Sequence, residues 1–539
     1  MTAINANYSD FNTVSLIDEN KHLPGIPTQF ATHEKTHAIG MGYLKGICIT
    51  TAIAFALAAT GAVIAATVGI VWIGALCVGI GAATVIGFVC IYAAVKAAKF
   101  LLTAKKIEKQ QFGHLDTELY HDVNSLRAGD LVKGNRAFVT ENAAESLENK
   151  LKIIKSAKQS IEISANYLGG NCCNLLLQSL IERLETRKGL QVHILVTPDF
   201  LGDEDLKNLE WMQEKYPDRF HLVITPVKVD LTPCFRFHEN HVKVVIVDEK
   251  YFVFGGSSIQ DFLSTQGNAE APFAPDANFL QKNILASSAR DHDVVGCGPI
   301  ASVMRKEFFK LYGIWECKTD IKSEKPASHY YPLTVEIPKE NEVLDEKVLK
   351  SDVSMRFLMS YPEETGSNPI TKAYSDIIKV ADEVIIGNMY FDPHKQIAEQ
   401  LYKKKVTLVT NGYTEGMSPL ENIAFIWGGR YYHYPKLHAD VYEFNIKNGL
   451  YHAKVIAAKG AHSVAGIGSY NFGWRSHAND HEAFMLLYGY EITRNMEDII
   501  NTDIALSKKV PEEEIKKYGT NISSKTLGRI NRYCTSIFV

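Results

Sequence analysis

The most informative absence in the sequence is charge, because no Asp, Glu, Lys or Arg occurs from Gly46 to Val95, a run of 50 residues. One membrane-spanning helix needs about 20 apolar residues, so this run is long enough for two. Glycines near its middle predict a turn, and we expect a transmembrane hairpin over 46–98, with helices at 47–69 and 73–95. The run begins too late and is too long for a secretory signal peptide. The alternative is an apolar core hairpin in a soluble protein, which is rare at this length.

Lysines flank the uncharged run on both sides, with Lys45 before it and Lys96 and Lys99 after it. The positive-inside bias therefore predicts an integral membrane protein with both ends of the hairpin, and the rest of the chain, on the cytoplasmic side. The hairpin is also similar in shape to membrane-inserted proteins that intracellular bacteria deliver, so a host membrane is an alternative location.

The sequence also has few cysteines and no excess of basic residues. None of its nine cysteines forms a Cys-x2-Cys pair, which argues against a disulfide framework or a zinc site and predicts reduced thiols. The net charge of −4 argues against a dedicated nucleic-acid-binding protein, so no nucleic-acid partner is expected.

Strands alternate with helices in two regions of the chain, which predicts an α/β fold with two lobes. Composition and periodicity together predict seven parts: a polar tail (1–45), the hairpin (46–98), a connector (99–140), a first lobe (141–316), a linker (317–351), a second lobe (352–505) and a C-terminal tail (506–539).

A reaction at a phosphate ester is indicated by His241 and Lys243, which stand two residues apart at the start of a β-branched run. Residues i and i+2 of a strand share one face, so the imidazole and the ammonium would lie together. Asp248 ends the run, and Gly255–Ser258 follows as a glycine-rich step. A nucleophilic imidazole beside a fixed cation suits attack on phosphorus.

A second copy of the His-x-Lys pattern supports the interpretation of the first as a catalytic motif. About two His-x-Lys or His-x-Arg triplets are expected by chance in this composition, and His33–Lys35 is one without a strand around it. His452 and Lys454 again precede a short apolar run, and Gly468–Asn471 follows at nearly the same distance.

The pair of motifs resembles the signature of the phospholipase D superfamily, H-x-K-x4-D followed by a G-[GS]-x-[NS] step, present twice. The run 468–482 looks like the family's G-S-x-N-x3-R-S-x2-N-x2-E segment, and 290–294 looks like its acidic segment after the first motif. The resemblance covers roughly residues 140 to 500. Two positions depart from the pattern: Lys459 stands where the family usually has Asp, and Ser258 where Asn is common.

The resemblance implies two α/β/α sandwich lobes related by a pseudo-two-fold axis, with one site built from both. One imidazole would attack phosphorus and form a phosphohistidine, while the other protonates the leaving alcohol. No metal or other cofactor is expected, since two ammonium groups take the place of a divalent cation. The expected site comprises His241 and His452, with Lys243 and Lys454 on the phosphate; Asp291 and Glu482 as orienting carboxylates, with Asp293 and Asp480 as alternatives; Ser257, Ser469 and Asn471 as phosphate-binding groups; and Asp248 as a structural support.

His241 is favoured as the nucleophile because its motif is the more complete. A metal pair at His477 and His481, or at His238 and His241, is a weaker interpretation, because the superfamily run already accounts for these segments. Four aromatic residues could line an acyl or headgroup pocket, although each is more often part of a core: Phe235, Phe237, Tyr470 and Trp474.

The leading functional hypothesis is a membrane-anchored phospholipase D that hydrolyses the distal phosphodiester of a glycerophospholipid to phosphatidic acid and a free headgroup. The alternative is phosphatidyl transfer to another lipid, as in bacterial cardiolipin synthases, which also have two N-terminal spans. A nuclease of the same superfamily and a membrane-tethered scaffold with inactive lobes are weaker hypotheses. The sequence leaves the headgroup preference and the oligomeric state open.

Overall fold

The computed structural model describes residues 128–197, 201, 203–225, 239–267, 288–317, 340–344, 352–362, 364, 368–413, 426–447 and 449–530. The predicted hairpin at 46–98, together with His33, Phe235, Phe237 and His238, lies outside them. Within the described part, no helix is both long and apolar enough to cross a membrane. All described residues except Glu364 belong to one compact unit, which contains both lobes.

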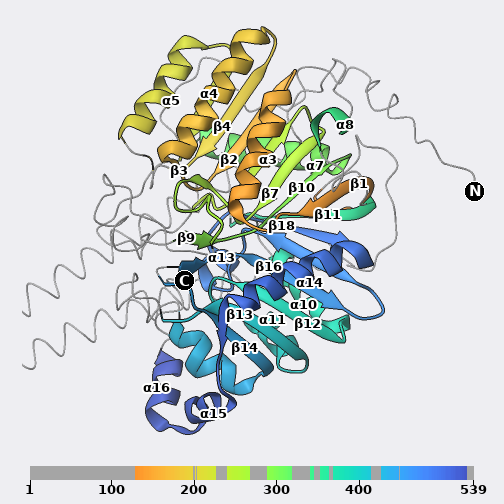
Figure 1. The fold of residues 1–539 in the computed structure, drawn as a ribbon, viewed down its shortest axis with the longest axis vertical. Helices are drawn as coiled ribbons and strands as arrows, with labels where there is room; N and C mark the ends of the chain where they lie inside the picture. The colour runs from red at the N-terminus through yellow and green to blue at the C-terminus, as the bar shows by residue number, and fades with distance from the viewer. Residues whose placement is uncertain are drawn as a thin grey trace, which may run out of the picture. The chain divides into compact units, whose positions relative to one another are not determined.

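The strands of the two lobes join in one mixed sheet, which has 15 strands among the described residues (Figure 1). On the first-lobe side are β1 (Val132–Val139), β2 (Ser160–Ala165), β4 (Gln191–Val196), β5 (Phe220–Ile224), β6 (Val244–Val247), β7 (Tyr251–Gly255) and β10 (Asp293–Cys297). On the second-lobe side are β11 (Asp352–Ser360), β12 (Glu383–Asn388), β13 (Lys405–Asn411), β14 (His438–Phe444), β16 (Lys454–Lys459), β17 (Val464–Gly468), β18 (Glu482–Tyr488) and β19 (Ser507–Lys509).

The strand order shows an internal repeat. One half of the sheet runs β1-β10-β7-β6-β2-β4-β5, and the other runs β11-β18-β17-β16-β12-β13-β14 with β19 added at its edge. The two orders correspond strand for strand, starting from the central pair β1 and β11. The predicted α/β fold class is confirmed.

Helices cover the sheet in both lobes. The first lobe contains α3 (Ala143–Ser156), α4 (Gly170–Thr186), α5 (Asp203–Lys215) and α7 (Ile300–Glu316), and α8 (Glu340–Val343) follows it. The second contains α10 (Pro369–Val380), α11 (Lys395–Leu401), the π-helix η5 (Gly428–His433), the 3-10 helix η6 (Tyr434–Lys436), α13 (Trp474–Ala478) and α14 (Tyr490–Ala505), followed by α15 (Glu512–Thr520) and α16 (Ile522–Ile530).

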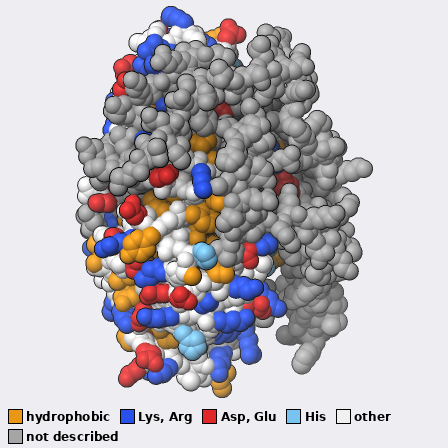
Figure 2. Space-filling model, turned by 90° about the vertical axis from the view of Figure 1, so that its right-hand side faces the viewer, with side chains coloured by type: hydrophobic (Ala, Val, Ile, Leu, Met, Phe, Trp, Pro, Cys, Tyr) orange, Lys and Arg blue, Asp and Glu red, His pale blue; other side chains and the backbone are white. Residues whose placement is uncertain are grey.

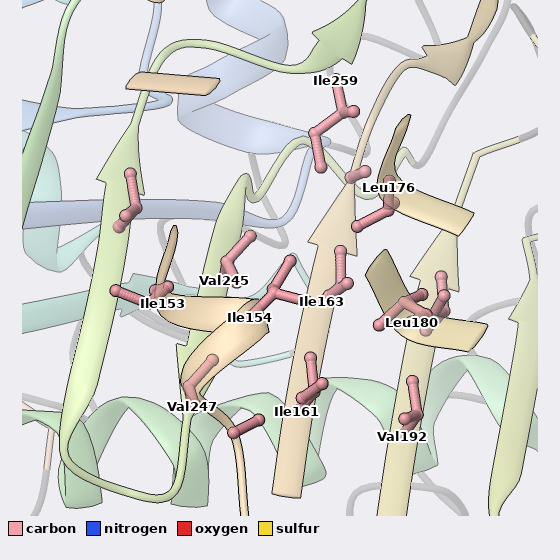
Figure 3. Packing of buried hydrophobic residues seen from close by; sticks show 14 of the residues in the cluster. Ile153, Ile154, Ile161, Ile163, Leu176, Leu180, Val192, Val245, Val247 and Ile259 are labelled. Atoms are coloured by element: carbon pink, nitrogen blue, oxygen red, sulfur yellow. The ribbon is translucent and has the colours of Figure 1, made fainter. Parts of the chain in front are cut away.

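Side-chain alternation along β2 explains why both faces of the first lobe are covered. Ile161 and Ile163 pack with Ile153 of α3 in one apolar core, which Figure 3 shows. Glu162 lies between them and therefore points to the opposite face, where Arg305 of α7 donates to it at 2.7 Å. Both groups are fully buried, and the ion pair satisfies charges that would otherwise be costly there.

The second lobe repeats this arrangement. Ile377 of α10 packs with Ile386 of β12 and Ile456 of β16 in a second apolar core. Helix α14 lies against β16 and β17 and also contacts β1 of the first half.

Among the described residues, three backbone pairings cross between the lobes. Strands β1 and β11 pair antiparallel at the centre of the sheet. Strand β9 (Ser288–Arg290) pairs parallel with β15 (Gly449–Tyr451), and Asn240 forms an isolated parallel bridge with His481. The last two pairings bring each His-x-Lys motif beside the acidic segment of the other lobe.

The described surface carries mixed charge. On the face in Figure 2, acidic and basic side chains are interspersed, with scattered apolar side chains between them.

Two elements of the first lobe begin at other residues than their sequence patterns predict. The apolar residues at 147, 151, 153 and 154 predict a helix from Ser146, but α3 begins at Ala143 because the side chain of Asn142 caps it by accepting from Glu145 N. Strand β6 begins only at Val244, so His241 and Lys243 lie just before the strand. There the backbone N of His241 donates to His481 O of the other lobe.

Candidate active site

Each motif histidine is bonded to a carboxylate from the opposite lobe. His241 of the first lobe places Nδ1 3.1 Å from both carboxylate oxygens of Glu482 in the second. His452 of the second lobe places Nδ1 2.6 Å from Oδ2 of Asp291 in the first. All four side chains are buried. The two imidazole–carboxylate pairs are therefore crossed, and neither lobe holds a complete pair by itself.

The crossing follows from backbone hydrogen bonds between the motifs and the acidic segments. His241 N donates to His481 O at 3.0 Å, next to Glu482. His452 N donates to Arg290 O at 2.8 Å, next to Asp291. Each histidine is thus aligned with the residue that precedes its carboxylate partner.

The two motif lysines curl back onto their own histidines. Lys243 Nζ donates to His241 O at 2.6 Å, and Lys454 Nζ donates to His452 O. Both ammonium groups are almost fully buried, which is unusual for lysine. They concentrate positive charge at the crossed pairs, as binding of a phosphate oxygen requires.

Burial lowers the proton affinity of all four basic groups. Burial and the nearby Lys454 lower the pKa of Lys243 to about 7, and burial lowers that of Lys454 to about 8. Burial and Lys454 also lower the pKa of His452 to about 4, against the opposing pull of Asp291. Burial, Lys243 and Lys454 hold the pKa of His241 well below its ordinary value, so this ring is a neutral imidazole near pH 7.

The two carboxylates are shifted in opposite directions. Burial raises the pKa of Glu482 to about 7, although Lys243 opposes the shift. Burial also acts to raise the pKa of Asp291, but His452 and Lys454 outweigh it and bring the value to about 2. Asp291 is therefore fully ionised near pH 7, whereas Glu482 titrates there.

Different contacts hold the two carboxylates. Glu482 accepts from the hydroxyls of Ser469 and Ser476, the latter at 2.5 Å. Asp291 Oδ1 accepts from the backbone N of His292 at 2.9 Å. It also packs against Gly256, where a Cβ would lie only 2.3 Å from Asp291 Oδ1. Ser476 belongs to the superfamily run at 468–482, but its contact with Glu482 becomes visible only in the folded structure.

The three predicted phosphate-binding groups have different surroundings. Ser469 bonds Glu482, as described above. Ser257 bonds Asp293 and receives a hydrogen bond from Lys150 Nζ at 2.7 Å. Two buried polar atoms, Asn471 Oδ1 and Ser258 Oγ, have no hydrogen-bond partner within the described structure. Ser258 and Asn471 end the two glycine-rich steps, so they occupy matching positions in the lobes.

Asp248 acts on the backbone of its own lobe. Its carboxylate accepts from the N atoms of Lys158, Gln159 and Ser160 at 2.7 to 3.2 Å, where the chain enters β2. Lys459, at the matching place in the second lobe, forms ion pairs with Glu383 at 2.9 Å and Glu497 at 2.6 Å. The second lobe thus replaces one buried carboxylate by a partly exposed ion-pair cluster.

The alternative acids are engaged elsewhere. Asp293 pairs with Lys150 at 2.9 Å, and Asp480 pairs with Arg475 at 3.0 Å. Arg475 also bonds Glu239 of the first lobe, which adds a further contact between the lobes.

Three further candidates from the sequence lie within the described residues. His477 bonds Thr371 at 2.8 Å and stacks on His394. Tyr470 is buried and bonds the same threonine, whereas Trp474 is 40% exposed. Over the described residues, no group of three or more His, Cys, Asp or Glu side chains is arranged to hold a metal ion.

Comparisons with known proteins point to the same family. Residues 374–504 match the family described as cardiolipin synthase, PLD-like domain. A cardiolipin synthase of Clostridium perfringens (strain SM101 / Type A) is 22% identical over 409 residues, which cover 75% of this chain and 73% of that protein. These matches confirm the resemblance to the phospholipase D superfamily, and with it an enzyme of the phosphodiesterase and phosphatidyltransferase type.

Two solved structures are also similar. Phosphatidylserine synthase of Haemophilus influenzae Rd KW20 has 13% sequence identity and a TM-score of 0.49, over 74% of this chain and 95% of that one. Polyphosphate kinase of Porphyromonas gingivalis has 11% identity and a TM-score of 0.39, over 69% of this chain and 50% of that one.

Proposed function

We propose that this protein is a cardiolipin synthase-like phosphatidyltransferase, which moves a phosphatidyl group from one alcohol to another through a phosphohistidine. The observation that carries the proposal is the crossed arrangement of His241 with Glu482 and His452 with Asp291, beside two buried lysines. Two imidazoles supply a nucleophile and a separate acid–base, which a two-step transfer requires.

His241 is the proposed nucleophile. Its Nδ1 atom faces Glu482, which leaves Nε2 of the neutral ring to attack phosphorus. The new N–P bond forms as the bond from phosphorus to the headgroup oxygen breaks. Glu482 stabilises the positive charge that develops on the ring.

His452 is the proposed general acid and base. Its short bond to the ionised Asp291 favours a protonated ring more strongly than the longer contacts of His241 do. In the absence of substrate, burial and Lys454 hold the pKa of His452 at about 4, so the ring is neutral near pH 7. The negative charge of a bound phosphodiester raises this pKa and supplies the protonated ring that the step requires. His452 then gives its proton to the departing alcohol, and later takes one from the incoming alcohol as the N–P bond breaks.

The phosphate itself is proposed to lie between Lys243 and Lys454. Asn471 and Ser258 add polar atoms that have no other hydrogen-bond partner within the described part of the chain. We therefore assign the phosphate-facing hydroxyl of the first lobe to Ser258 in place of Ser257, whose hydroxyl is engaged by Asp293.

Hydrolysis is the second candidate function, because water can attack the same phosphohistidine and release phosphatidic acid. Transfer is favoured over hydrolysis by the matches to cardiolipin synthases. The uncharged run at 46–98 supports a position at a membrane, where a second lipid alcohol is concentrated.

The test is to incubate the full-length protein with phosphatidylglycerol vesicles in ¹⁸O-labelled water and identify the products by mass spectrometry. Transfer predicts cardiolipin and glycerol, both lost in His241→Ala and in His452→Ala. His462→Ala, at an exposed histidine, is the matched control and should leave the yield unchanged. Labelled phosphatidic acid as the main product would replace transfer by hydrolysis, and no lipid turnover would contradict both.

A further inference from the structure

A third buried carboxylate lies beside the His452 half-site. Asp503 stands near the C-terminal end of α14 and is fully buried. It accepts from Arg290 Nε at 2.6 Å, from the Tyr451 hydroxyl at 2.9 Å, and contacts His292 Nε2 at 2.8 Å. One carboxylate thus collects three partners from separate segments.

All three partners are sequence neighbours of the His452–Asp291 pair. Arg290 and His292 flank Asp291, and Tyr451 precedes His452. The backbones of Tyr451 and Arg290 are also directly paired where β15 meets β9. Asp503 therefore ties together the two strand ends that carry the imidazole and its carboxylate.

The contacts hold Asp503 in its charged form. Burial acts to raise its pKa, but His292 and Arg290 outweigh burial and keep the value below normal. The same partners are fixed at their other ends, because Arg290 donates to Gln266 O at 2.9 Å and His292 Nδ1 lies 3.1 Å from Thr140 O. A charged, fully bonded group in a buried site resists reorientation.

The sheet is shaped to admit the Tyr451 side chain. A Cβ atom at Gly387 of β12 would lie 2.0 Å from the Tyr451 hydroxyl oxygen, so only glycine leaves room for it. Asn411 holds the same tyrosine by its backbone, accepting from Tyr451 N at 2.8 Å and donating to Tyr451 O at 2.6 Å.

The other half-site is built differently. His481, which precedes Glu482 as Arg290 precedes Asp291, packs against the rings of Trp315 in α7 and Tyr361. Glu482 itself is held by serine hydroxyls. The cluster of Asp503 with Arg290, His292 and Tyr451, called the hub below, therefore contacts only the half-site of His452 among the described contacts.

We propose that Asp503 is a positioning residue for the His452–Asp291 pair, and that it sets the geometry with which His452 exchanges a proton with the substrate alcohol. This inference rests on the proposed function, in which His452 is the general acid and base. It extends the site to α14, outside both motifs.

The test compares two esters of the same phosphatidyl group. Phosphatidylglycerol has a poor leaving group that needs protonation, whereas phosphatidyl-4-nitrophenol releases nitrophenolate without a general acid. For Asp503→Asn we expect kcat on phosphatidylglycerol to fall about 100-fold with KM little changed, because small misplacements near a reacting group have effects of this size. The initial nitrophenolate burst should fall much less. Asp498→Asn, an exposed acid on the same helix, should match wild type.

Tyr451→Phe keeps the test informative if Asp503→Asn does not fold. It removes one hydroxyl from the hub and should give a smaller loss with the same selectivity for phosphatidylglycerol. An equal loss on both esters, or no loss on either, in a variant with wild-type thermal unfolding would overturn the proposal.

His452→Ala separates the inference from the proposed function. If it shows the selective loss while both hub variants do not, the role of Asp503 is wrong and the acid–base assignment stands. If His452→Ala affects both esters equally, or wild type turns over neither, the assignment of His452 fails and the role of Asp503 fails with it.

Discussion

His241 and His452 come from two copies of one motif and bond carboxylates in the same crossed manner, yet their surroundings differ. The partner of His241 is Glu482, held by neutral hydroxyls, with its pKa raised by burial to about 7. The partner of His452 is Asp291, whose pKa is held at about 2 against burial by His452 and Lys454. One fold can thus place two similar groups in environments that suit different roles, here a neutral nucleophile and a proton carrier.

The largest expected effect separates the histidines themselves. His241→Ala should abolish turnover and leave no covalent phosphatidyl-enzyme, because the attacking nitrogen is gone. His452→Ala should slow turnover of phosphatidylglycerol by about 10²- to 10⁴-fold, the usual contribution of a general acid, while still forming the adduct from a nitrophenyl ester. The adduct is measured by mass spectrometry after the reaction is stopped without acid, because a phosphohistidine hydrolyses in acid. An adduct on His241→Ala but none on His452→Ala would exchange the two roles.

The second-largest effect should separate the two carboxylates, because substitutions at Asp291 and Glu482 should change kcat/KM with different pH dependence. Asp291→Asn should lower kcat/KM by up to about 10⁴-fold at every pH tested, since an amide supports the wrong tautomer of its imidazole. Glu482 becomes ionised as pH rises through about 7, so wild-type kcat/KM should increase over that range. Lys243 also has a pKa of about 7 and Lys454 one of about 8, so both lysines lose their protons close to the same range. The value of kcat/KM should therefore fall on the alkaline side, which gives a narrow bell-shaped profile with its maximum near pH 7.

Glu482→Gln sharpens this comparison because glutamine resembles the protonated acid. The loss of kcat/KM in Glu482→Gln relative to wild type should be small at pH 6 and grow towards pH 8. A pH-independent deficit of the same size as that of Asp291→Asn would mean that the two half-sites are equivalent.

A smaller effect should distinguish Ser469, which bonds Glu482, from Ser257, which bonds Asp293. Ser469→Ala removes a hydrogen bond that lowers the pKa of Glu482, so the acidic limb of the profile should move to higher pH. Ser257→Ala should instead lower the free energy of unfolding by about 1–3 kcal/mol, because it leaves buried Asp293 and Lys150 short of a partner. Urea titration and pH profiles of both variants test this, and a shifted profile in Ser257→Ala would contradict the division.

The smallest expected effect concerns Lys459, where the superfamily usually has Asp. Lys459→Asp places an acid beside Glu383 and Glu497 and should destabilise the protein by about 1 kcal/mol, as expected for a partly exposed ion pair. Lys459→Ala should cost less, and kcat should be unchanged in both. A gain in stability from Lys459→Asp would mean that the second lobe keeps an unused carboxylate site like that of Asp248.

Much of the fold could be predicted because its signals are local. The β-branched run after Lys243 and the alternation along β2 depend on near neighbours, and the β-branched run coincides with β6. Helix ends were less predictable, since they depend on caps such as Asn142 that act through a single hydrogen bond. The predicted hairpin at 46–98 lies outside the described residues and stays a prediction.

The contacts of the candidate site were harder to predict than its residues. Ser257 and Ser258 are adjacent and chemically identical, so only the position of Asp293 and Lys150 shows which hydroxyl is already engaged. Asp503 lies outside both motifs, and no spacing rule connects it to His292, 211 residues away.

The sequence by itself determined that two His-x-Lys motifs exist, that each precedes an apolar strand, and that an acidic segment follows each of them. These features depend on residue type and short-range periodicity. Only the tertiary structure decided which acid meets which imidazole, since the pairing depends on how β9 and β15, and Asn240 and His481, align across the lobes. It also decided the different proton affinities of Asp291 and Glu482, because burial and neighbouring charge arise only once both lobes are packed together.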